Sequence, residues 1–214
     1  TGHSILERYG MTETNMNTSN PYAGDRRPGT VGFPLHDVEL KITDPKTGDL
    51  VEDGEIGQIE VRGANVFKGY WKMPEKTREE LRDDGFFITG DLARRDEEGY
   101  IHIVGRNKDL IISGGYNIYQ KEIETLLDEQ TGVQESAVVG LPHPDFGETP
   151  VAFLIFKLGA EVDLSKIDAI VLNQLARFKH PKRLIVLDEL PRNTMGKVQK
   201  NILREQYNDL FLKT

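Results

Sequence analysis

The chain has 214 residues, of which 37% are hydrophobic and 29% charged, the ordinary composition of a globular protein with one or two cores. No apolar run approaches the roughly 18 residues of a membrane-spanning helix, and we expect no membrane partner. The absence of cysteine excludes disulfides, thiolate metal sites and thiol nucleophiles, and fits a reducing, cytoplasmic setting. Chemistry must then come from lysine, histidine, carboxylates, hydroxyls or backbone groups.

The net charge of −8 is unevenly spread along the chain. Residues 1–105 contain 13 basic and 20 acidic residues, whereas residues 106–214 contain 14 and 15. This change predicts two domains, 1–105 and 106–214. Residues 177–205 hold eight basic and three acidic residues, which suits a small phosphorylated ligand better than nucleic acid. A solvated charged surface is the alternative.

The N-terminus begins TGHSILERYG, with neither an initiator methionine nor the basic and apolar segments of a signal peptide. Such a start is typical of a chain entered partway through a domain. We therefore expect a fragment of a longer protein.

Short alternating runs dominate residues 29–105. The runs at 38–42 and 58–62 predict strands, and the turn-rich segments 44–49 and 52–55 separate them, which indicates an antiparallel sheet or a piece of a barrel. One helix is expected to begin at Pro74, because proline followed by acidic residues is typical of a helix start.

The second half alternates strands with amphipathic helices, which predicts a small α+β domain. Helices are expected at 120–130, at 163–178 with Asp163 or Ser165 as its cap, and at 200–212. Strands are expected at 110–112, 137–139, 151–156 and 184–187, the first of them running into a tight turn at 113–115.

Two short segments of the first half combine side chains suited to a nucleotide. Residues 9–13, YGMTE, offer an aromatic ring for a base, a small residue and a hydroxyl for phosphate, and a carboxylate that can bind Mg²⁺ through oxygen. Residues 87–91, FITGD, end an expected short strand in Asp91, which could accept hydrogen bonds from both ribose hydroxyls. Each segment alone could equally be an ordinary turn.

A lysine lies on a glycine-containing loop near the C-terminus, where residues 191–197 read PRNTMGK. Lys197 follows the expected strand at 184–187 and could be delivered to a developing anion. The alternative is a solvated turn. A third segment, GRNKD at 105–109 followed by SGG at 113–115, lies where the composition changes.

Taken in order, these segments resemble the core motifs of the adenylate-forming superfamily. The order is YGMTE at 9–13, GQIEVRG at 57–63 with GY at 69–70, TGD at 89–91, GRNKD at 105–109 and NTMGK at 193–197. The superfamily includes acyl-CoA synthetases, luciferases and the adenylation domains of peptide synthetases. The resemblance covers nearly the whole chain.

The resemblance implies an α+β fold in two parts. Residues 1–105 would be the β-rich, barrel-like end of a large N-terminal domain, and residues 106–214 a small α+β lid with its hinge near Lys108. The Ser/Thr/Gly-rich phosphate loop of the family would lie upstream, and no Gly-x-x-x-x-Gly-Lys-Ser/Thr loop replaces it. We therefore expect the missing N-terminal domain to be a partner, and little or no ATP-driven activity from this chain alone.

The resemblance also assigns roles in forming an acyl-adenylate from ATP. Lys197 would bridge the attacking carboxylate and the α-phosphate, Thr12 would contact phosphate, and Glu13 would bind Mg²⁺. Tyr9 would stack on adenine, and Asp91 with Arg106 would fix the ribose. The nucleotide-binding residues implied in this way are Tyr9, Gly10, Met11, Thr12, Asp91, Arg106 and Lys197.

In the second step the lid would turn about Lys108 and coenzyme A would attack the acyl carbonyl. Ser113, Gly114 and Gly115 would leave room for the pantetheine arm. ATP, Mg²⁺ and coenzyme A are thus the implied cofactors and co-substrates. An exposed essential Lys197 on a mobile loop would also be open to a lysine acyltransferase and a deacylase, because acylation removes its charge.

Within the superfamily, ERYGMTETNMNTSNP at 7–21 and RPGTVG at 27–32 are most similar to malonyl-CoA synthetases. A dicarboxylic acid such as malonate or methylmalonate needs a cation for its second carboxylate, and the Arg8 guanidinium could bind one bidentately. Met16 could line a small acyl pocket. The alternatives are another short-chain or fatty acyl-CoA synthetase, and a non-catalytic lid fragment that binds a nucleotide or coenzyme A.

Overall fold

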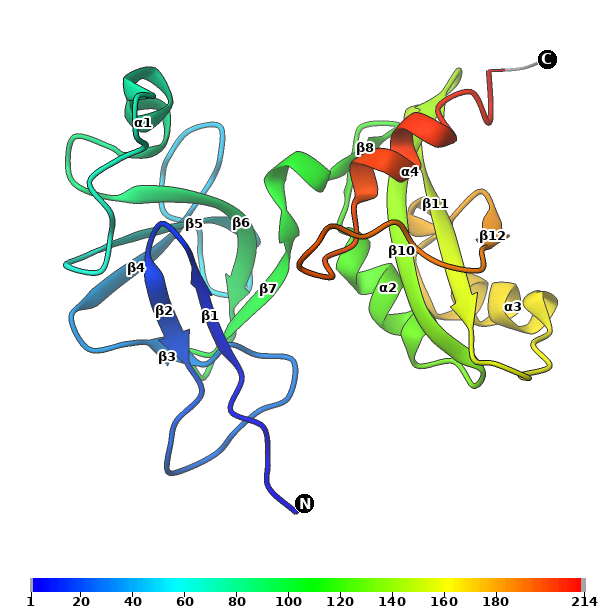
Figure 1. Ribbon diagram of the computed structural model, residues 1–214, viewed down its shortest axis with the longest axis horizontal. Helices are drawn as coiled ribbons and strands as arrows, with labels where there is room; N and C mark the ends of the chain where they lie inside the picture. Colours follow the sequence, from blue (N-terminus) through cyan, green and yellow to red (C-terminus); the bar gives the residue numbers. More distant parts are fainter. Residues whose placement is uncertain (1, 213–214) are drawn as a thin grey trace. The chain divides into compact units, whose positions relative to one another are not determined.

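The computed structural model describes residues 2–212 and divides into two compact units, Thr1–Asn107 and Lys108–Thr214 (Figure 1). Each unit has its own hydrophobic core. The longest helix among the described residues has 11 residues, too few to cross a bilayer, which needs about 20.

Two open antiparallel sheets form the first unit. One contains β1 (Arg8–Met11), β2 (Asn15–Ser19) and β3 (Phe33–Pro34), and the other has the order β4 (Val38–Thr43), β5 (Gly57–Gly63), β6 (Phe87–Arg95), β7 (Ile101–Arg106). The expected antiparallel pairing is confirmed, although the described strands do not close into a barrel. Helix α1 (Pro74–Glu80) begins at the expected proline.

Strand β6 does not end at Asp91, so the expectation of a short strand ending in this carboxylate is wrong. The strand continues to Arg95 because residues 89–91 form a bulge: Gln58 and Glu60 of β5 pair with Leu92 and Ile88. Gly90 has φ +73°, which glycine adopts readily, and the Thr89 hydroxyl donates to the Ile59 carbonyl at 3.0 Å. Such a bulge re-aims the side chains beside it.

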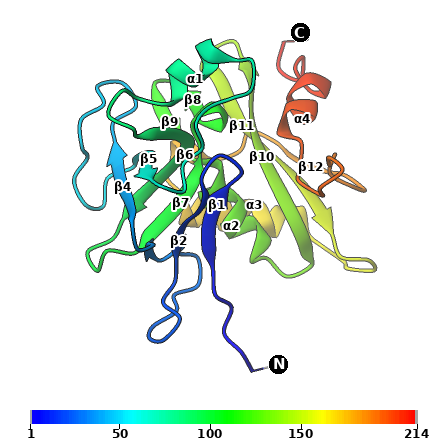
Figure 2. The same cartoon turned by 60° about the vertical axis from the view of Figure 1, so that its left-hand side comes forward.

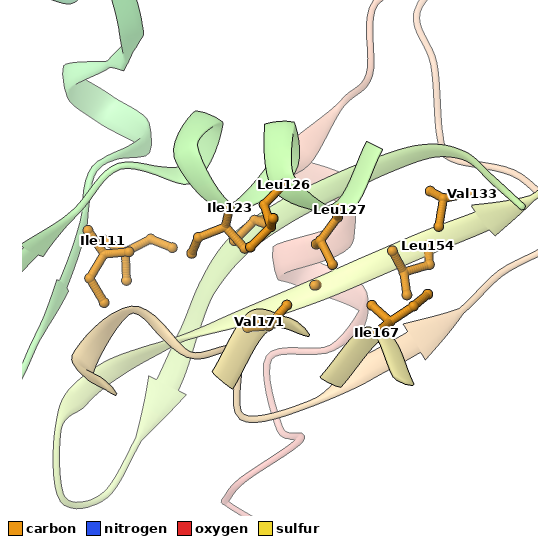
Figure 3. Packing of buried hydrophobic residues seen from close by; sticks show 11 residues of the cluster. Ile111, Ile123, Leu126, Leu127, Val133, Leu154, Ile167 and Val171 are labelled. Atoms are coloured by element: carbon orange, nitrogen blue, oxygen red, sulfur yellow. The ribbon is translucent and has the colours of Figure 1, made fainter. Parts of the chain in front are cut away.

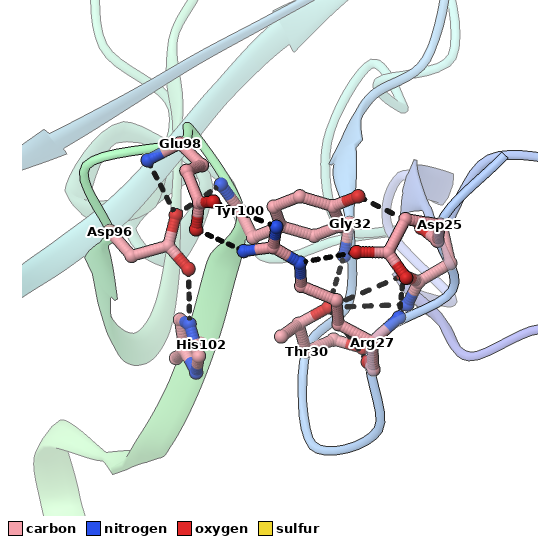
Figure 4. A network of polar contacts seen from close by, with 9 residues as sticks. Asp25, Arg27, Thr30, Gly32, Asp96, Glu98, Tyr100 and His102 are labelled. Atoms are coloured by element: carbon pink, nitrogen blue, oxygen red, sulfur yellow. Dashed lines mark hydrogen bonds and ion pairs between the residues drawn. The ribbon is translucent and has the colours of Figure 1, made fainter.

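A polar network fixes the segment after β2 against the turn between β6 and β7 (Figure 4). The Arg27 guanidinium donates to Glu98 at 2.9 Å and lies 4.2 Å from the centre of the Tyr100 ring. The Tyr100 hydroxyl donates to the Asp25 carbonyl at 2.8 Å, and His102 Nε2 lies 2.9 Å from Asp96 Oδ2. The network thereby holds the turn around residues 27–32 in place, together with Val31, which packs against the core of the first unit.

A second network joins β4 to β5 around the buried side chain of Glu60. The Glu60 side chain is fully buried, receives two hydrogen bonds from Arg82 at 2.7 and 2.8 Å and one from Thr43 at 2.9 Å, and lies 3.2 Å from Lys41 Nζ. Burial alone would raise the pKa of Glu60, but hydrogen bonds from Arg82, Thr43 and Lys41 outweigh it and lower the pKa. The carboxylate is therefore ionised and fully paired.

A five-stranded sheet forms the second unit. Its strands are β8 (Ile111–Ser113), β9 (Tyr116–Ile118), β10 (Val133–His143), β11 (Gly147–Phe156) and β12 (Leu184–Val186). Strand β12 is parallel to β11 and the other pairs are antiparallel. The helices are α2 (Gln120–Asp128), α3 (Leu164–Gln174) and α4 (Lys200–Gln206), with 3₁₀ turns at Asn107–Asp109 and Arg177–Lys179.

Alternation along β10 and β11 builds a core on each face of this sheet. Val138 and Leu154 point to one face, where α2 and α3 cover them (Figure 3). Val139 and Phe153 point to the other face, where they pack with Leu203 of α4. Figure 2 shows β10 and β11 as the two long strands of the unit. The expected α+β fold is confirmed.

Two helices are shorter than expected. Helix α3 is capped by Asp163, which accepts from the Ser165 amide at 3.0 Å, but it ends at Gln174 rather than 178, because Leu175 is extended and its carbonyl lies 2.9 Å from His180 Nε2. Helix α4 ends at Gln206 rather than 212, and the Tyr207 ring packs against Phe153 with their centroids 4.8 Å apart. A local contact with His180 thus accompanies the early end of α3, and a tertiary contact with Phe153 the early end of α4.

Candidate functional site

Three of the expected nucleotide-binding side chains meet in the first unit. The Tyr9 hydroxyl donates to Asp91 Oδ2 at 2.6 Å, and Arg106 Nε lies 3.1 Å from Asp91 Oδ1. Asp91 and Arg106 are direct partners across β6 and β7. Burial, and then the Asp91 charge, raise the pKa of Tyr9, which stays a hydrogen-bond donor at neutral pH. We call Tyr9, Asp91 and Arg106 the nucleotide cluster.

The β1–β2 hairpin separates core-facing from exposed side chains. Tyr9 and Met11 pack against the first unit's core, whereas Arg8 and Gly10 are exposed. A Cβ at Gly10 would lie 2.0 Å from the Asn15 carbonyl oxygen, so only glycine allows this close approach of the two strands. Thr12 is exposed in the turn that follows β1. This turn therefore presents the Thr12 hydroxyl to solvent at the end of β1, the strand that contains Tyr9.

Glu13 is half-buried and has an aromatic neighbour that the sequence analysis did not assign. Its Oε1 lies 3.2 Å from the Tyr70 hydroxyl, which donates to Glu80 at 2.5 Å. Burial, and then the hydrogen bond to Glu80, raise the pKa of Tyr70. The segment GY at 69–70 was recognised only as part of a motif. The structure places the Tyr70 hydroxyl between the Glu13 and Glu80 carboxylates.

One carboxylate from Glu13 suits a Mg²⁺ ion that is bound mainly by phosphate and water oxygens, as this ion usually is in nucleotide sites. Residues 2–212 contain no group of three or more carboxylate or histidine side chains that could hold a metal without such a ligand. The donor set thus fits Mg²⁺ only together with a phosphorylated substrate.

Arg8 and Met16 lie on the exposed face of the β1–β2 hairpin. Gly10 pairs with Met16, whose side chain is 38% exposed, and Arg8 pairs with Ser19. Among the described residues the Arg8 guanidinium makes no ion pair or side-chain hydrogen bond. Its charge is available to an anionic ligand.

The second unit presents Lys197 on a closed hairpin, residues 191–199. Arg192 and Val198 form a β-bridge, and the Asn193 amide donates to the Lys197 carbonyl at 3.0 Å. The Asn193 side chain accepts from the Lys197 amide at 2.9 Å, and Gly196 has φ +78°. The Lys197 side chain is exposed and, within residues 2–212, its ammonium has no carboxylate partner. We call this segment the Lys197 hairpin.

A cavity of about 450 Å³ lies beside the expected coenzyme A segment. Ser113 ends β8, and Gly114 and Gly115 turn the chain with φ of +55° and +85°. The rings of Tyr116 and Phe178 stack there with centroids 4.7 Å apart. The cavity is lined by Ser113, Gly114, Tyr116, Phe146, Thr149, Arg177, Phe178, His180 and Lys182. We call it the Ser113 pocket.

The structure separates the basic residues of 177–205 into two groups. Four are paired with carboxylates of the same unit: Lys179 with Glu122 at 2.7 Å, Lys200 with Glu124 at 2.6 Å, Arg204 with Asp109 at 2.6 Å, and Arg192 with Glu135. Arg177 and Lys182 instead line the Ser113 pocket. The charge pattern alone gave no means of telling these groups apart, and the aromatic pair had no sequence signal.

Lys108 is the first residue of the second unit and lies in the exposed 3₁₀ turn Asn107–Asp109. Lys108 itself is exposed, whereas its two neighbours are held by side chains: Asn107 donates to Gln58 Oε1 at 3.3 Å and Asp109 accepts from Arg204 at 2.6 Å. This position is consistent with the expected hinge.

Comparison with protein families identifies both units. The family model described as AMP-binding enzyme matches residues 1–71, and the model described as AMP-binding enzyme C-terminal domain matches residues 122–197. The chain belongs to the AMP-binding enzyme family. The five ordered motifs therefore indicated the correct family.

Several members of the AMP-binding enzyme family are similar over nearly the whole chain. The crystal structure of ATP-bound MatB from Rhodopseudomonas palustris is 61% identical with a TM-score of 0.94, covering 99% of this chain and 42% of that one. Malonate–CoA ligase of Arabidopsis thaliana is 42% identical, over 96% of this chain and 35% of its own length. Long-chain-fatty-acid–CoA ligase of Bacillus subtilis is 41% identical, over 100% and 38%. The chain thus spans about two fifths of the length of these relatives.

Proposed function

We propose that the chain is the C-terminal part of an AMP-forming acyl-CoA synthetase, which converts a carboxylic acid, ATP and coenzyme A into an acyl-CoA. The observation that carries the proposal is the Ser113 pocket, because a stacked aromatic pair next to Arg177 and Lys182, which have no ion-pair partner within residues 2–212, suits a phosphorylated nucleotide. This site lies in the second unit, whereas the nucleotide cluster lies in the first. Two nucleotide sites are what a ligase using both ATP and coenzyme A requires.

In the first step an oxygen of the substrate carboxylate attacks the α-phosphorus of ATP. A bond forms between these two atoms, the bond from the α-phosphorus to the oxygen that bridges it to the β-phosphorus breaks, and pyrophosphate leaves. Catalysis is then mainly positioning and charge neutralisation. Asp91 keeps lone pairs free to accept from the ribose hydroxyls, Thr12 contacts phosphate, and Tyr9 with Gly10 and Met11 borders the base. Lys197 places its free ammonium between the carboxylate and the α-phosphate. Glu13 would hold a Mg²⁺ ion, which would supply further neutralisation of phosphate charge.

In the second step the thiol of coenzyme A attacks the acyl carbonyl, a carbon–sulfur bond forms, and AMP leaves. Rotation of the lid about Lys108 withdraws Lys197 from the active site and brings the segment 113–115 to it. The glycines of this segment leave space for the pantetheine arm, and the nucleotide end of coenzyme A occupies the Ser113 pocket between the aromatic pair, Arg177 and Lys182.

Malonate is the substrate that we propose, with methylmalonate as a close analogue. Support comes from the unpaired Arg8 guanidinium on the exposed face of the hairpin and from 42% identity to a malonate–CoA ligase. Because a long-chain-fatty-acid–CoA ligase is 41% identical, competition among malonate, methylmalonate, acetate and a fatty acid must decide. Replacement Arg8→Met should remove the preference for a dicarboxylate, and an unchanged preference would exclude this role of Arg8.

The proposal is tested by ATP- and malonate-dependent release of pyrophosphate. We expect turnover from a protein that includes the upstream domain and little from the 214-residue chain alone, because most of the ATP and acid pocket would lie upstream. Release by neither protein, with coenzyme A still bound, would favour a non-catalytic nucleotide- or CoA-binding lid.

Acylation of Lys197 is a further proposal about control. The side chain is exposed and unpaired, so a lysine acyltransferase could reach it, and a deacylase could restore the charge. Mass spectrometry of protein from cells with high acetyl-CoA should find modified Lys197. Its consistent absence there would exclude this control.

A further inference from the structure

We infer that Glu135 and Arg192 are positioning residues that fix the peptide bond before Lys197 and thereby aim its ammonium. The inference rests on the proposed role of Lys197 in adenylation. It concerns a contact within the second unit, between residues that are 57 positions apart in the sequence.

Both polar atoms of the Gly196–Lys197 peptide are held by side chains. Arg192 Nη1 donates to the Gly196 carbonyl at 2.7 Å, and Asn193 Oδ1 accepts from the Lys197 amide at 2.9 Å. A Cβ at Gly196 would have no heavy atom within 4 Å, so packing does not restrain this peptide. Its orientation therefore depends on these two hydrogen bonds together with two backbone bonds, from the Gly196 amide to the Asn193 carbonyl at 2.9 Å and from the Asn193 amide to the Lys197 carbonyl at 3.0 Å.

Arg192 in turn is held by Glu135 of β10, with which its Nη2 forms a short ion pair. One guanidinium thus joins the hairpin tip to the central sheet. Both legs of the hairpin are also anchored there, since Leu190 is buried in the core on that face and Val198 packs against it. We therefore expect the Lys197 hairpin to move with the lid as one body.

A bulge in β10 is what turns Glu135 toward the hairpin. Val133 pairs with Phe156 but Glu135 pairs with Ile155, so Gln134 is an extra residue. Val133 packs on the α2–α3 face, and strict alternation would place Glu135 there too. Because of the bulge, Glu135 instead shares the face of Ala137 and Val139, where the Lys197 hairpin lies. The bulge thus places Glu135 where it can hold Arg192 and, through it, the peptide before Lys197.

The test uses the complete enzyme and measures the two half-reactions separately. Adenylation is followed by malonate-dependent exchange of pyrophosphate into ATP, and thioester formation by the reaction of preformed malonyl-adenylate with coenzyme A. The variants are Glu135→Ala, Glu135→Gln and Lys197→Ala. The matched control is Glu39→Gln, which breaks the exposed Glu39–Arg62 pair of the first unit.

We expect Glu135→Ala to lower kcat of adenylation about tenfold, since small displacements of a reacting group are costly, with the KM values for ATP and malonate unchanged. Glu135→Gln should lose less, because its amide oxygen can still accept from Arg192. Thioester formation and the control should stay within about twofold of wild type.

Three results would overturn the inference: no loss of adenylation in Glu135→Ala, equal losses in both half-reactions, or a Gln variant as impaired as the Ala variant. Lys197→Ala distinguishes the inference from the proposed function. If adenylation survives without Lys197, both the role of the lysine and its positioning fail. If it is abolished while Glu135→Ala is fully active, only the positioning fails.

Discussion

The nucleotide cluster and the Lys197 hairpin differ in how their charges are balanced. In the first unit, Asp91 meets both of its donors, Tyr9 and Arg106, within 3.1 Å. In the second, the backbone of Lys197 is held by several hydrogen bonds while its ammonium has no carboxylate partner within residues 2–212. The first unit supplies acceptors that are organised before a ligand arrives. The second supplies an aimed cation whose counter-charge must come from outside its own unit.

Lys197→Ala should have the largest effect and should separate the two steps. Removal of one preorganised cation is expected to lower the rate of adenylation about 10²–10³-fold in the complete enzyme. Thioester formation from preformed acyl-adenylate should be largely intact, because the lysine has then withdrawn. Equal losses in both steps would show that the hairpin does not alternate with the Ser113 pocket.

Glu60→Gln should destabilise the first unit by about 2 kcal/mol at pH 7, because Arg82 and Lys41 lose a charged hydrogen-bond acceptor but are themselves partly exposed to water. The folded pKa of Glu60 is lowered, so its contribution is complete above the ordinary glutamate pKa of about 4.3 and is lost as the pH falls through the lowered value. The difference between variant and wild type should therefore shrink in acid. Hydrogen exchange at pH 7 should speed up in β4 and β5 and not in β10 and β11.

The control for this prediction is Glu39→Gln, whose carboxylate is exposed and whose loss should have little effect on stability. Faster exchange in β10 and β11 of Glu60→Gln would mean that the two units do not unfold separately.

Asp91→Ala should weaken ATP binding by about 10- to 100-fold, as expected when hydrogen bonds to one charged group are removed. The KM for ATP in the complete enzyme is the measurement, and the KM for coenzyme A should not change. A matching loss for coenzyme A would indicate that the cluster supports the fold and has no specific role in ATP binding.

Phe178→Leu should have the smallest effect, raising the KM for coenzyme A about three- to tenfold through loss of one aromatic face. The KM for ATP should be unaffected. This variant and Asp91→Ala together test whether the first unit binds ATP and the second binds coenzyme A, since each variant should alter the KM for one of these substrates only.

The elements with a clear period could be predicted from the sequence. The spacing of Ile123, Leu126 and Leu127 correctly predicted α2, and the apolar run at 151–156 correctly predicted the buried part of β11. The limits of β6, α3 and α4 were wrong, because a bulge at Gly90, the contact of His180 with Leu175 and the packing of Tyr207 on Phe153 override the helical and strand periodicity. Local patterns contain no information on such contacts.

The candidate site shows the same division. Motifs located Tyr9, Asp91 and Lys197, whose chemistry is visible in a few adjacent residues. Pairs distant in the sequence, such as Tyr116 with Phe178, have no such pattern and became visible only once the sheet brought them together.

The anchored ends and the exposed tip of the Lys197 hairpin should tolerate different kinds of sequence change. Leu190 before the hairpin and Leu203 after it are buried in one core, so the length of chain between them is fixed. Thr194 and Met195 at the tip are exposed, and Met195 is 77% accessible. Homologous proteins should therefore vary freely in the identity of the tip residues and hardly at all in their number, and a single inserted residue should be more damaging than several substitutions.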